Sequence, residues 1–339
     1  MTLGIIIASC VVVSCVATGL WRVVLVRHAV LDQANARSSH TGSIPRAGGV
    51  VFCVLTLLYA VVSLALDWSD PRAAMILIVG GGLVAIIGFV DDIKPLPAAV
   101  RFLTHAIAAV VLVVGLSPLP QSIAGISVVI PAWLIQVLLA IAVMWSINLW
   151  NFMDGIDGLA GSQAMIVLAG LTLVAGCSGS SGILPAVMAG LVGGFLLWNL
   201  SSRRLFMGDA GSGFLGFAVL LMIAVLWTRG DIPIWSGVLA AAMMWIDATV
   251  TLVRRTMRGQ RPWVAHRSHV YQHLVQGNWS HRQVTAVYGA LQVVFLCPLA
   301  LAAIYWPWAG PWLTAGVVVV LVPIAVSLGG GVDASRAER

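Results

Sequence analysis

The chain has 339 residues, of which 60% are hydrophobic and 9% are charged, with a formal net charge of +6. Soluble globular proteins carry about 25% charged residues, so this composition excludes a soluble fold, a disordered chain and a fibrous protein. It indicates a helical protein that crosses a membrane many times. The positive charge suits an anionic inner leaflet and requires no nucleic-acid partner.

Apolar runs long enough to cross a bilayer recur along the whole chain, since each crossing needs about 20 residues. The sequence predicts about eleven spanning helices, at residues 3–21, 48–66, 73–90, 102–116, 132–147, 159–176, 183–200, 213–228, 232–253, 284–304 and 311–328. No internal repeat divides the chain. We therefore expect an all-α polytopic membrane protein with one domain over residues 1–339, of which the last ten form a disordered tail.

The distribution of basic residues predicts how these helices are oriented. Of the 18 Lys and Arg residues, all but Arg72 and Arg229 fall on one side of the predicted membrane. Basic loops are retained on the cytoplasmic side. We therefore expect the N-terminus outside and the C-terminus in the cytoplasm, as an odd number of spans requires.

Aspartates gather at the predicted cytoplasmic ends of the spans. These residues are Asp91, Asp92, Asp154, Asp157, Asp209 and Asp247. A carboxylate at a membrane edge is costly unless a cation or a metal pairs with it. Each one alone could be an anchor paired with an arginine, but their recurrence beside Gly and Asn favours a shared functional site.

The third predicted span ends on Asp91, Asp92 and Lys94. Adjacent helical residues diverge by about 100°. One carboxylate is therefore free to hold a metal while the other faces a second substrate or Lys94.

The connector after the fifth span carries Asn151, Asp154 and Asp157 among glycines. The two aspartates share a face if the segment is helical, and the glycines let the backbone approach a ligand closely. These groups suit hydrogen bonding to a ribose and a base, or to a hydrated Mg²⁺.

A Gly-rich turn from Phe206 to Gly213 follows Asn199 and contains Asp209. Such a turn presents free N–H groups and the positive end of a helix dipole to a phosphate. Asp209 would supply a hard oxygen to Mg²⁺. A plain helix cap accounts for Asp209 and one glycine, but not for Asn199.

The last long connector on this side contains His266, Arg267, His269 and His273. Its histidines line one face if the segment is helical, and the loop is rich in Arg and free of acids. Anion binding by Arg267 and the imidazoles is therefore favoured over a metal site and over a plain basic loop.

Together these segments resemble the polyprenyl-phosphate N-acetylhexosamine-1-phosphate transferases of bacteria, over nearly the whole chain. The first loop, which begins DQANARSSH at Asp32 and continues with PRAGG at Pro45, is similar to the family's first motif. The Asp pair, the NxxDGxDG segment, the FMGDxGS turn and the His-containing loop then follow in the family's order.

The resemblance implies an enzyme that transfers N-acetylhexosamine 1-phosphate from a UDP-N-acetylhexosamine to undecaprenyl phosphate and releases UMP. It implies a Mg²⁺ cofactor, with Mn²⁺ as the alternative metal. It places the protein among the lipids of the bacterial inner membrane, with the active site on the cytoplasmic face and without a nucleic-acid partner. A homodimer is compatible with these expectations.

The resemblance also implies roles for individual residues. It implies catalysis by Asp91, Asp92 and His269, and metal binding by Asp209 and Asp92. It implies nucleotide binding by Asn151, Asp154, Asp157, Asn199 and Phe206. It implies contacts with phosphate or lipid at Lys94, Arg101, Arg267, His266, His273, Asn35, Arg37 and Arg46.

Departures from the family pattern favour one branch. Ala34 replaces the usual proline, and Lys94 lies closer to the Asp pair than in the peptidoglycan branch. The His-containing loop lacks three consecutive histidines. The O-antigen or surface-glycan branch is therefore favoured over the phospho-MurNAc-pentapeptide transferase of peptidoglycan. A secondary transporter or lipid flippase is the alternative from another class, but its acids should lie near the bilayer midplane on broken helices.

Overall fold

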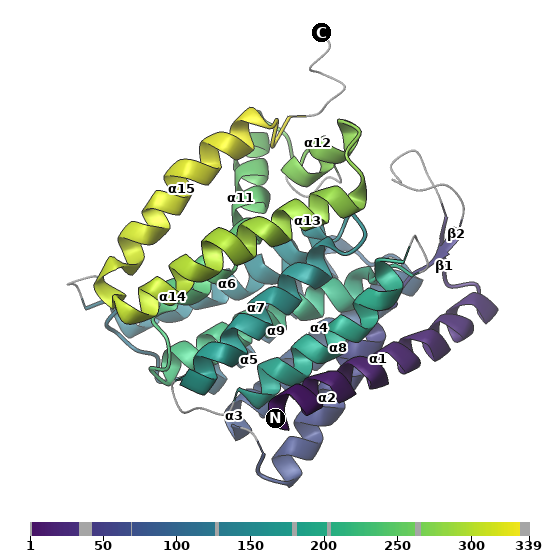
Figure 1. Cartoon of the computed structure of the whole chain (residues 1–339), viewed down its shortest axis with the longest axis horizontal. Helices are drawn as coiled ribbons and strands as arrows, with labels where there is room; N and C mark the ends of the chain where they lie inside the picture. Colours follow the sequence, from purple (N-terminus) through teal and green to yellow (C-terminus); the bar gives the residue numbers. More distant parts are fainter. Residues whose placement is uncertain are drawn as a thin grey trace.

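The computed structural model of the chain describes residues 2–33, 43–68, 70–125, 129–177, 182–201, 205–261 and 266–332. Most of this part is helical (Figure 1). The α-helices are α1 (Thr2–Arg27), α2 (Val50–Ala65), α3 (Pro71–Ile76), α4 (Gly82–Ile93), α5 (Ala98–Leu116), α6 (Ala132–Met153), α7 (Leu159–Cys177), α8 (Ile183–Asn199), α9 (Gly208–Thr228), α10 (Ile234–Ala240), α11 (Ala242–Met257), α12 (Val270–Gln276), α13 (His281–Leu291), α14 (Cys297–Tyr305) and α15 (Gly310–Ser327). The π-helical turns are η1 (Leu77–Gly81) and η2 (Gln292–Leu296), and η3 (Pro307–Ala309) is a 3₁₀ turn. Strands β1 (Leu31–Gln33) and β2 (Ser43–Pro45) pair in antiparallel fashion.

Every predicted apolar run falls on a helix or on consecutive helices, which confirms the expected all-α polytopic membrane protein. Within the described residues, 8 helices are long and apolar enough to cross a membrane, or up to 9 if α10 and α11 form one span. Helices α2 and α8 are apolar but shorter, with 16 and 17 residues. The count of eleven spans and the positions of the termini stay predictions.

One predicted span, residues 232–253, is broken rather than continuous. Helices α10 and α11 meet at Ala241 with a bend of 74°. Side chains satisfy carbonyls that the break frees: Gln292 Nε2 donates to Ala240 O, and Trp245 Nε1 donates to Val238 O at 2.9 Å. The predicted span is therefore bent in its middle, and a distant polar side chain, Gln292, bonds to the bend.

Helix α9 lies at the centre of the bundle, and nearly all of its residues are buried. It packs against α2, α4, α6 and α7, and glycines bring the backbones close together. A Cβ added to Gly88 of α4 would lie 2.6 Å from the backbone of Ala210, and one added to Gly49 would lie 2.5 Å from Gly211 Cα. The N-terminus of α9 is therefore held tightly between α4 and the segment that enters α2.

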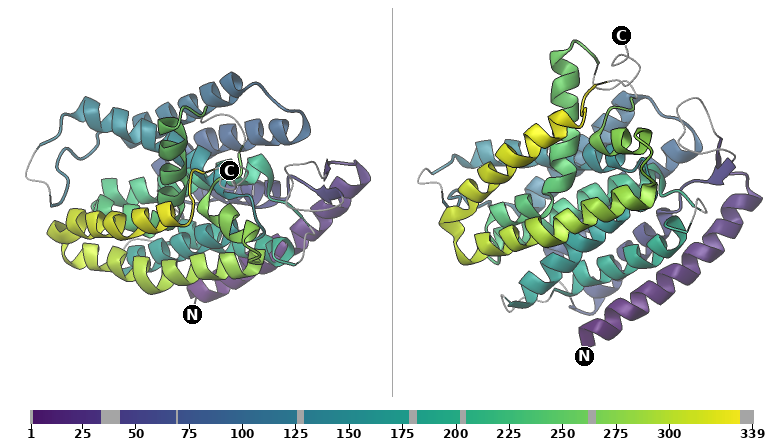
Figure 2. Two further views of the ribbon diagram at one scale, coloured as in Figure 1. Left: turned by 90° about the horizontal axis from the view of Figure 1, so that it is seen from above. Right: turned by 45° about the horizontal axis from the view of Figure 1, so that its top comes forward.

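The helix ends predicted to be cytoplasmic gather at one end of the bundle. Hydrogen bonds and ion pairs join the start of α9 to the ends of α4 and α6 and to the start of α5. Other hydrogen bonds join the start of α7 to the end of α8 and to α13. Helix α1 packs along α8 at one edge, and α13, α14 and α15 form another edge (Figures 1 and 2).

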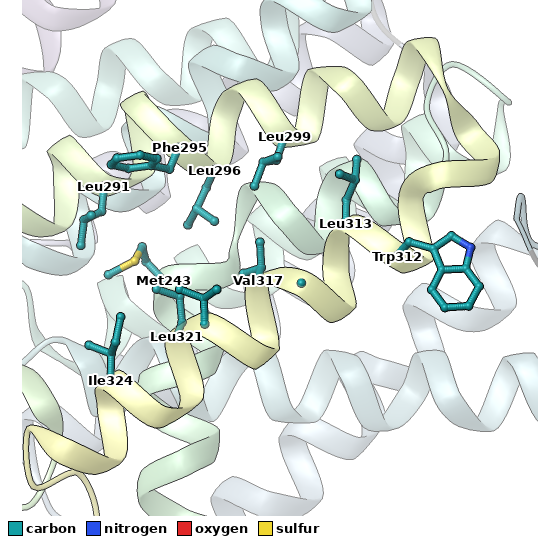
Figure 3. A pocket seen from close by; sticks show the side chains of 12 residues that line it. Met243, Leu291, Phe295, Leu296, Leu299, Trp312, Leu313, Val317, Leu321 and Ile324 are labelled. Atoms are coloured by element: carbon teal, nitrogen blue, oxygen red, sulfur yellow. The ribbon is translucent and has the colours of Figure 1, made fainter.

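A cavity of about 490 Å³ lies between α15 and the helices α11, α13 and α14 (Figure 3). Its walls are apolar side chains such as Met243, Phe295 and Val317. No charged side chain lines it. Its lining therefore offers no group that could bind a charged substrate.

Candidate functional site

Three aspartates and two arginines meet at the N-terminus of α9. We call Arg46, Asp91, Asp92, Arg101 and Asp209 the acid–arginine cluster. Arg46 Nε lies 2.8 Å from Asp92 Oδ1, and Arg46 Nη2 lies 2.9 Å from Asp209 Oδ1. Arg101 Nη1 lies 2.9 Å from Asp91 Oδ2 and 3.9 Å from Asp209 Oδ2. The fold thus brings together residues that are more than 100 positions apart in sequence.

Asp92 holds the first turn of α9 in place. Its Oδ1 accepts a hydrogen bond from the backbone N–H of Asp209 at 2.9 Å, and its Oδ2 accepts one from Ala210 at 3.2 Å. Its side chain has no exposed surface. Because both oxygens are engaged by the helix, the position of Asp92 favours a capping role over the predicted metal ligation.

Gly208 allows this close contact between Asp92 and α9. Its φ is +79°, a conformation that costs a side chain energy but is open to glycine. A Cβ at this position would lie 2.5 Å from Asp92 Oδ2 and 2.9 Å from Ala47 Cα.

Asp209 is the most accessible carboxylate of the cluster. Its side chain is 21% exposed, against 8% for Asp91 and 0% for Asp92. Asn151 Nδ2 donates to Asp209 Oδ1 at 3.0 Å and to Ser212 Oγ at 3.1 Å. The same nitrogen of Arg101, Nη1, lies close to Asp91 and to Asp209. Two carboxylates therefore lie side by side next to the guanidinium of Arg101.

The donor set of the cluster fits a magnesium ion that is shared with a substrate. In the part of the chain that the structure describes, no three Asp, Glu, His or Cys side chains form a metal site by themselves. Mg²⁺ in phosphate-handling sites keeps several waters and takes one or two carboxylates plus phosphate oxygens. Asp209 supplies one carboxylate, and Asp91 beside it is the second candidate, although its Oδ1 accepts from Leu96 N and its Oδ2 accepts from Arg101. Two adjacent carboxylates also favour a cation between them.

The predicted Asp154–Asp157 pair is split in the structure. Asp157 Oδ2 lies 3.1 Å from Nδ1 of His281, and its carbonyl accepts a hydrogen bond from Thr285 Oγ1 at 3.0 Å. Asp154 instead lies close enough to the cluster to be affected by its charges. Burial away from water raises the pKa of Asp154, and the negative charges of Asp209 and other carboxylates raise it further. His281, 124 residues from Asp157, carried no sequence signal that would have linked the two.

Asn199 holds two loops together. It is 4% exposed; its Oδ1 accepts from Gly158 N at 2.7 Å, and its Nδ2 donates to Leu205 O at 3.0 Å. Phe206 is half-buried, and its carbonyl accepts from Gly48 N at 2.8 Å. Nucleotide contacts by Asn199 and Phe206 stay predictions.

A buried carboxylate, Asp247, anchors the histidine loop. It is 3% exposed and accepts hydrogen bonds from Val270 N at 2.9 Å, from Tyr271 N at 3.2 Å and from Tyr288 Oη at 2.7 Å. His269 Nδ1 lies 3.4 Å from Asp247 Oδ1. Asp247 therefore fixes the start of α12. Asp247 stands out in the sequence as an acid near the end of a span, but no local pattern links it to His269, Tyr271 or Tyr288.

His269 lies beside Asp247 at the start of α12. It is 2% exposed, and its ring stacks on His266 and Tyr271 with centroids 5.0 and 5.7 Å away. Tyr271 Oη donates to Phe152 O at 2.9 Å and so joins α12 to the end of α6. The predicted catalytic role of His269 stays a prediction, and this position favours a positioning role.

The other predicted phosphate contacts lie at separate places. His266 Nδ1 is 2.9 Å from Ser268 Oγ, Arg267 is half-buried, and the ring of His273 lies against Gly329. Lys94 is exposed at the end of α4. Asn35 and Arg37 lie outside the described residues. Arg46 and Arg101 are the predicted phosphate ligands that join the cluster in the described part of the chain.

A second cavity, of about 440 Å³, lies beside the cluster between α4, α5, α6 and α9. Asp209, Asn151 and Arg101 line its polar end, and Ile87 and Phe102 are among its apolar walls. Phe102 is 62% exposed, so the cavity borders the lateral surface of the bundle. A molecule in the bilayer could therefore reach the cluster from the side.

Comparison with known proteins adds independent information. Residues 74–227 match the model of glycosyl transferase family 4, a stretch that includes the three cluster aspartates. The chain is similar to decaprenyl-phosphate N-acetylglucosaminephosphotransferase of Mycolicibacterium smegmatis, with 29% identity over 91% of this chain and 85% of that protein. It is also similar to a probable undecaprenyl-phosphate N-acetylglucosaminyl 1-phosphate transferase of Bacillus subtilis, with 25% identity over 91% of this chain and 86% of that protein. With undecaprenyl-phosphate alpha-N-acetylglucosaminyl 1-phosphate transferase of Escherichia coli it shares 27% identity over 84% of this chain and 79% of that protein.

Proposed function

The chain belongs to glycosyl transferase family 4, and from this membership we propose that it transfers N-acetylhexosamine 1-phosphate from a UDP-N-acetylhexosamine to undecaprenyl phosphate. The names of the relatives support a polyprenyl phosphate acceptor and an N-acetylglucosamine phosphate donor. UMP is the second product. We further propose that the reaction initiates an O-antigen or another surface polysaccharide at the cytoplasmic face of a bacterial inner membrane.

The observation that carries this proposal is the acid–arginine cluster at the end of a laterally open cavity. The reaction forms a bond between an oxygen of the lipid phosphate and the β-phosphorus of the donor, and it breaks the bond from that phosphorus to UMP. Two anions must therefore meet, which requires positive charge and a fixed in-line geometry.

The chain provides positive charge from two sources. Arg46 and Arg101 are half-exposed and bonded to carboxylates, and we propose that they exchange part of these bonds for phosphate oxygens. The N-terminus of α9, held by Asp92, directs its dipole toward the same place. Asp209, with Asp91 beside it, would hold Mg²⁺ or Mn²⁺, which would neutralise phosphate charge when bound.

The two substrates would approach from different sides. The polyprenyl chain would occupy the apolar part of the cavity beside α5, with its phosphate at the polar end. The uridine would lie over Asn151 and Asp154, toward Phe206, because aromatic rings stack on bases and polar groups read their edges. Asp154 is favoured over Asp157 here because Asp157 is paired with His281.

A transporter is less well supported. Its binding site would use free backbone groups at a broken helix, whereas the break between α10 and α11 has two of its carbonyls bonded by Gln292 and Trp245. The cluster lies at helix ends instead.

The proposal is tested with purified protein, undecaprenyl phosphate and a panel of UDP-N-acetylhexosamines. We expect a lipid-linked sugar phosphate and UMP with at least one donor, loss of turnover with a chelator, and recovery with Mg²⁺ or Mn²⁺. Absence of UMP with every donor would contradict the proposed reaction. Turnover that survives chelation would contradict the proposed metal.

A further inference from the structure

His105 is an ionisable residue within α5, a helix whose other residues, apart from Arg101 and Thr104, are apolar. An ionisable side chain inside a membrane span is costly and by default marks a function. His105 follows Arg101 by four residues, so it lies on the same helix face, one turn farther from the helix start. Arg101 in turn contacts Asp91 and Asp209.

The imidazole of His105 has unused hydrogen-bonding capacity beside the cluster. The residue lines the cavity of about 440 Å³ together with Arg101, Asn148 and Asp209. Its Nδ1 is covered by protein and has no hydrogen-bond partner within the described ranges. Because a buried N–H without an acceptor is costly, the proton belongs on Nε2. The Nε2–H group is then the donor left for a ligand in the cavity.

The surroundings of His105 favour the lipid acceptor over the nucleotide donor. Phe102, in the same cavity wall, is 62% exposed on the surface of α5, so this wall adjoins the bilayer. Of the residues that we assign to the nucleotide, Asn151 lies at the polar end of the cavity, whereas Asp154 and Phe206 do not line it.

We infer that His105 donates a hydrogen bond from Nε2 to a phosphate oxygen of the polyprenyl phosphate and so positions that phosphate beside Arg101. The inference rests on the proposed transfer reaction. It makes His105 a determinant of the KM for the lipid phosphate, while the KM for the UDP-sugar does not depend on it.

Four variants test this role by steady-state kinetics in detergent, with undecaprenyl phosphate and the UDP-sugar varied separately. H105L removes the donor, and H105N keeps a polar side chain that is too short to reach the position of Nε2. Both should raise the KM for undecaprenyl phosphate on the order of tenfold, as expected for a lost hydrogen bond to a charged group. H105Q, whose amide reaches the same point, should restore most of the lipid affinity. T104V is the matched control, because the Thr104 hydroxyl bonds to Val100 O of its own helix at 3.0 Å.

The possible results distinguish a failure of the proposed role of His105 from a failure of the proposed transfer reaction. An active wild type whose lipid KM is unchanged in both H105L and H105N overturns the role of His105 alone. A rise in the KM for the UDP-sugar instead would place His105 on the donor and also overturn it. A wild type that forms no lipid product overturns the proposed function and this inference with it.

Discussion

Asp209 is the residue on which the proposed chemistry depends most. It is the most exposed carboxylate of the cluster, and it contacts Arg46 and Asn151 directly. D209N keeps an acceptor for the amide of Asn151 but removes the charge that would hold a metal. We expect turnover to fall by about 100-fold or more, while the protein still inserts and purifies as a folded species.

D231N is the control for D209N. Asp231 is also paired with an arginine, Arg229, at 3.3 Å, but it follows the opposite end of α9. Its removal should leave turnover unchanged. Near-normal activity of D209N would assign Asp209 to helix capping alone.

Gly208 lies beside the cluster and Gly230 follows the opposite end of α9, so the same substitution at both positions isolates the effect of the contact with Asp92. Their φ angles are +79° and +78°, so an alanine is strained by about 1–2 kcal/mol at either position. A Cβ at position 208 would also press on Asp92 and Ala47, whereas one at position 230 meets nothing within 4 Å. We expect G208A to lose most activity and to unfold at a lower temperature in detergent than G230A. Equal losses in the two variants would show that the contact with Asp92 is unimportant.

Some of the site could be predicted from the sequence at this scale. Asp91, Asp92, Asn151 and Asp209 lie in short polar segments of an apolar chain, and the cost of carboxylates at a membrane edge indicates their function. The roles within the set could not be predicted, because the difference between Asp91 and Asp92 depends on which one faces the start of α9.

At the scale of elements, the carboxylate of Asp247 binds two backbone N–H groups at the start of α12, and Tyr271 adds a second link from α12 to the end of α6. D247N would offer one acceptor where two are needed and would leave buried donors unpaired, at a cost of about 1–3 kcal/mol each. We expect faster tryptic cleavage after Arg267 and a loss of turnover of about tenfold, because small displacements of groups near a site slow the reaction. T251V, which removes one longer hydrogen bond to Asp247 at 3.3 Å, serves as the milder control. Unchanged cleavage in D247N would contradict the anchoring role.

The positions of helices were predictable, but their breaks and long-range ties were not. Apolar runs about 20 residues long specify helices because backbone groups in a bilayer must bond within the segment. The bend at Ala241 contains neither glycine nor proline and depends on Gln292, some 50 residues away. The tie between Asp157 and His281 likewise depends on packing of α7 against α13 that no local pattern encodes.

At the scale of the whole molecule, the bundle places a charged site at one end. Next to it lies a cavity with a polar end and apolar walls that borders the lateral surface of the bundle. This arrangement suits a reaction between a water-soluble nucleotide sugar and a lipid that stays in the bilayer. In the proposed reaction the sugar travels with its phosphate, so the donor's diphosphate bond is the one that breaks.

The most direct test follows the β-phosphorus of the donor. A UDP-N-acetylhexosamine that carries ³²P in its β-phosphate is incubated with the purified protein and undecaprenyl phosphate, and lipid and aqueous phases are separated. We expect the label to enter the lipid phase with the sugar, while an equal amount of unlabelled UMP appears in the aqueous phase. Label that remains in the aqueous phase as UDP, while the sugar alone reaches the lipid, would contradict the proposed reaction.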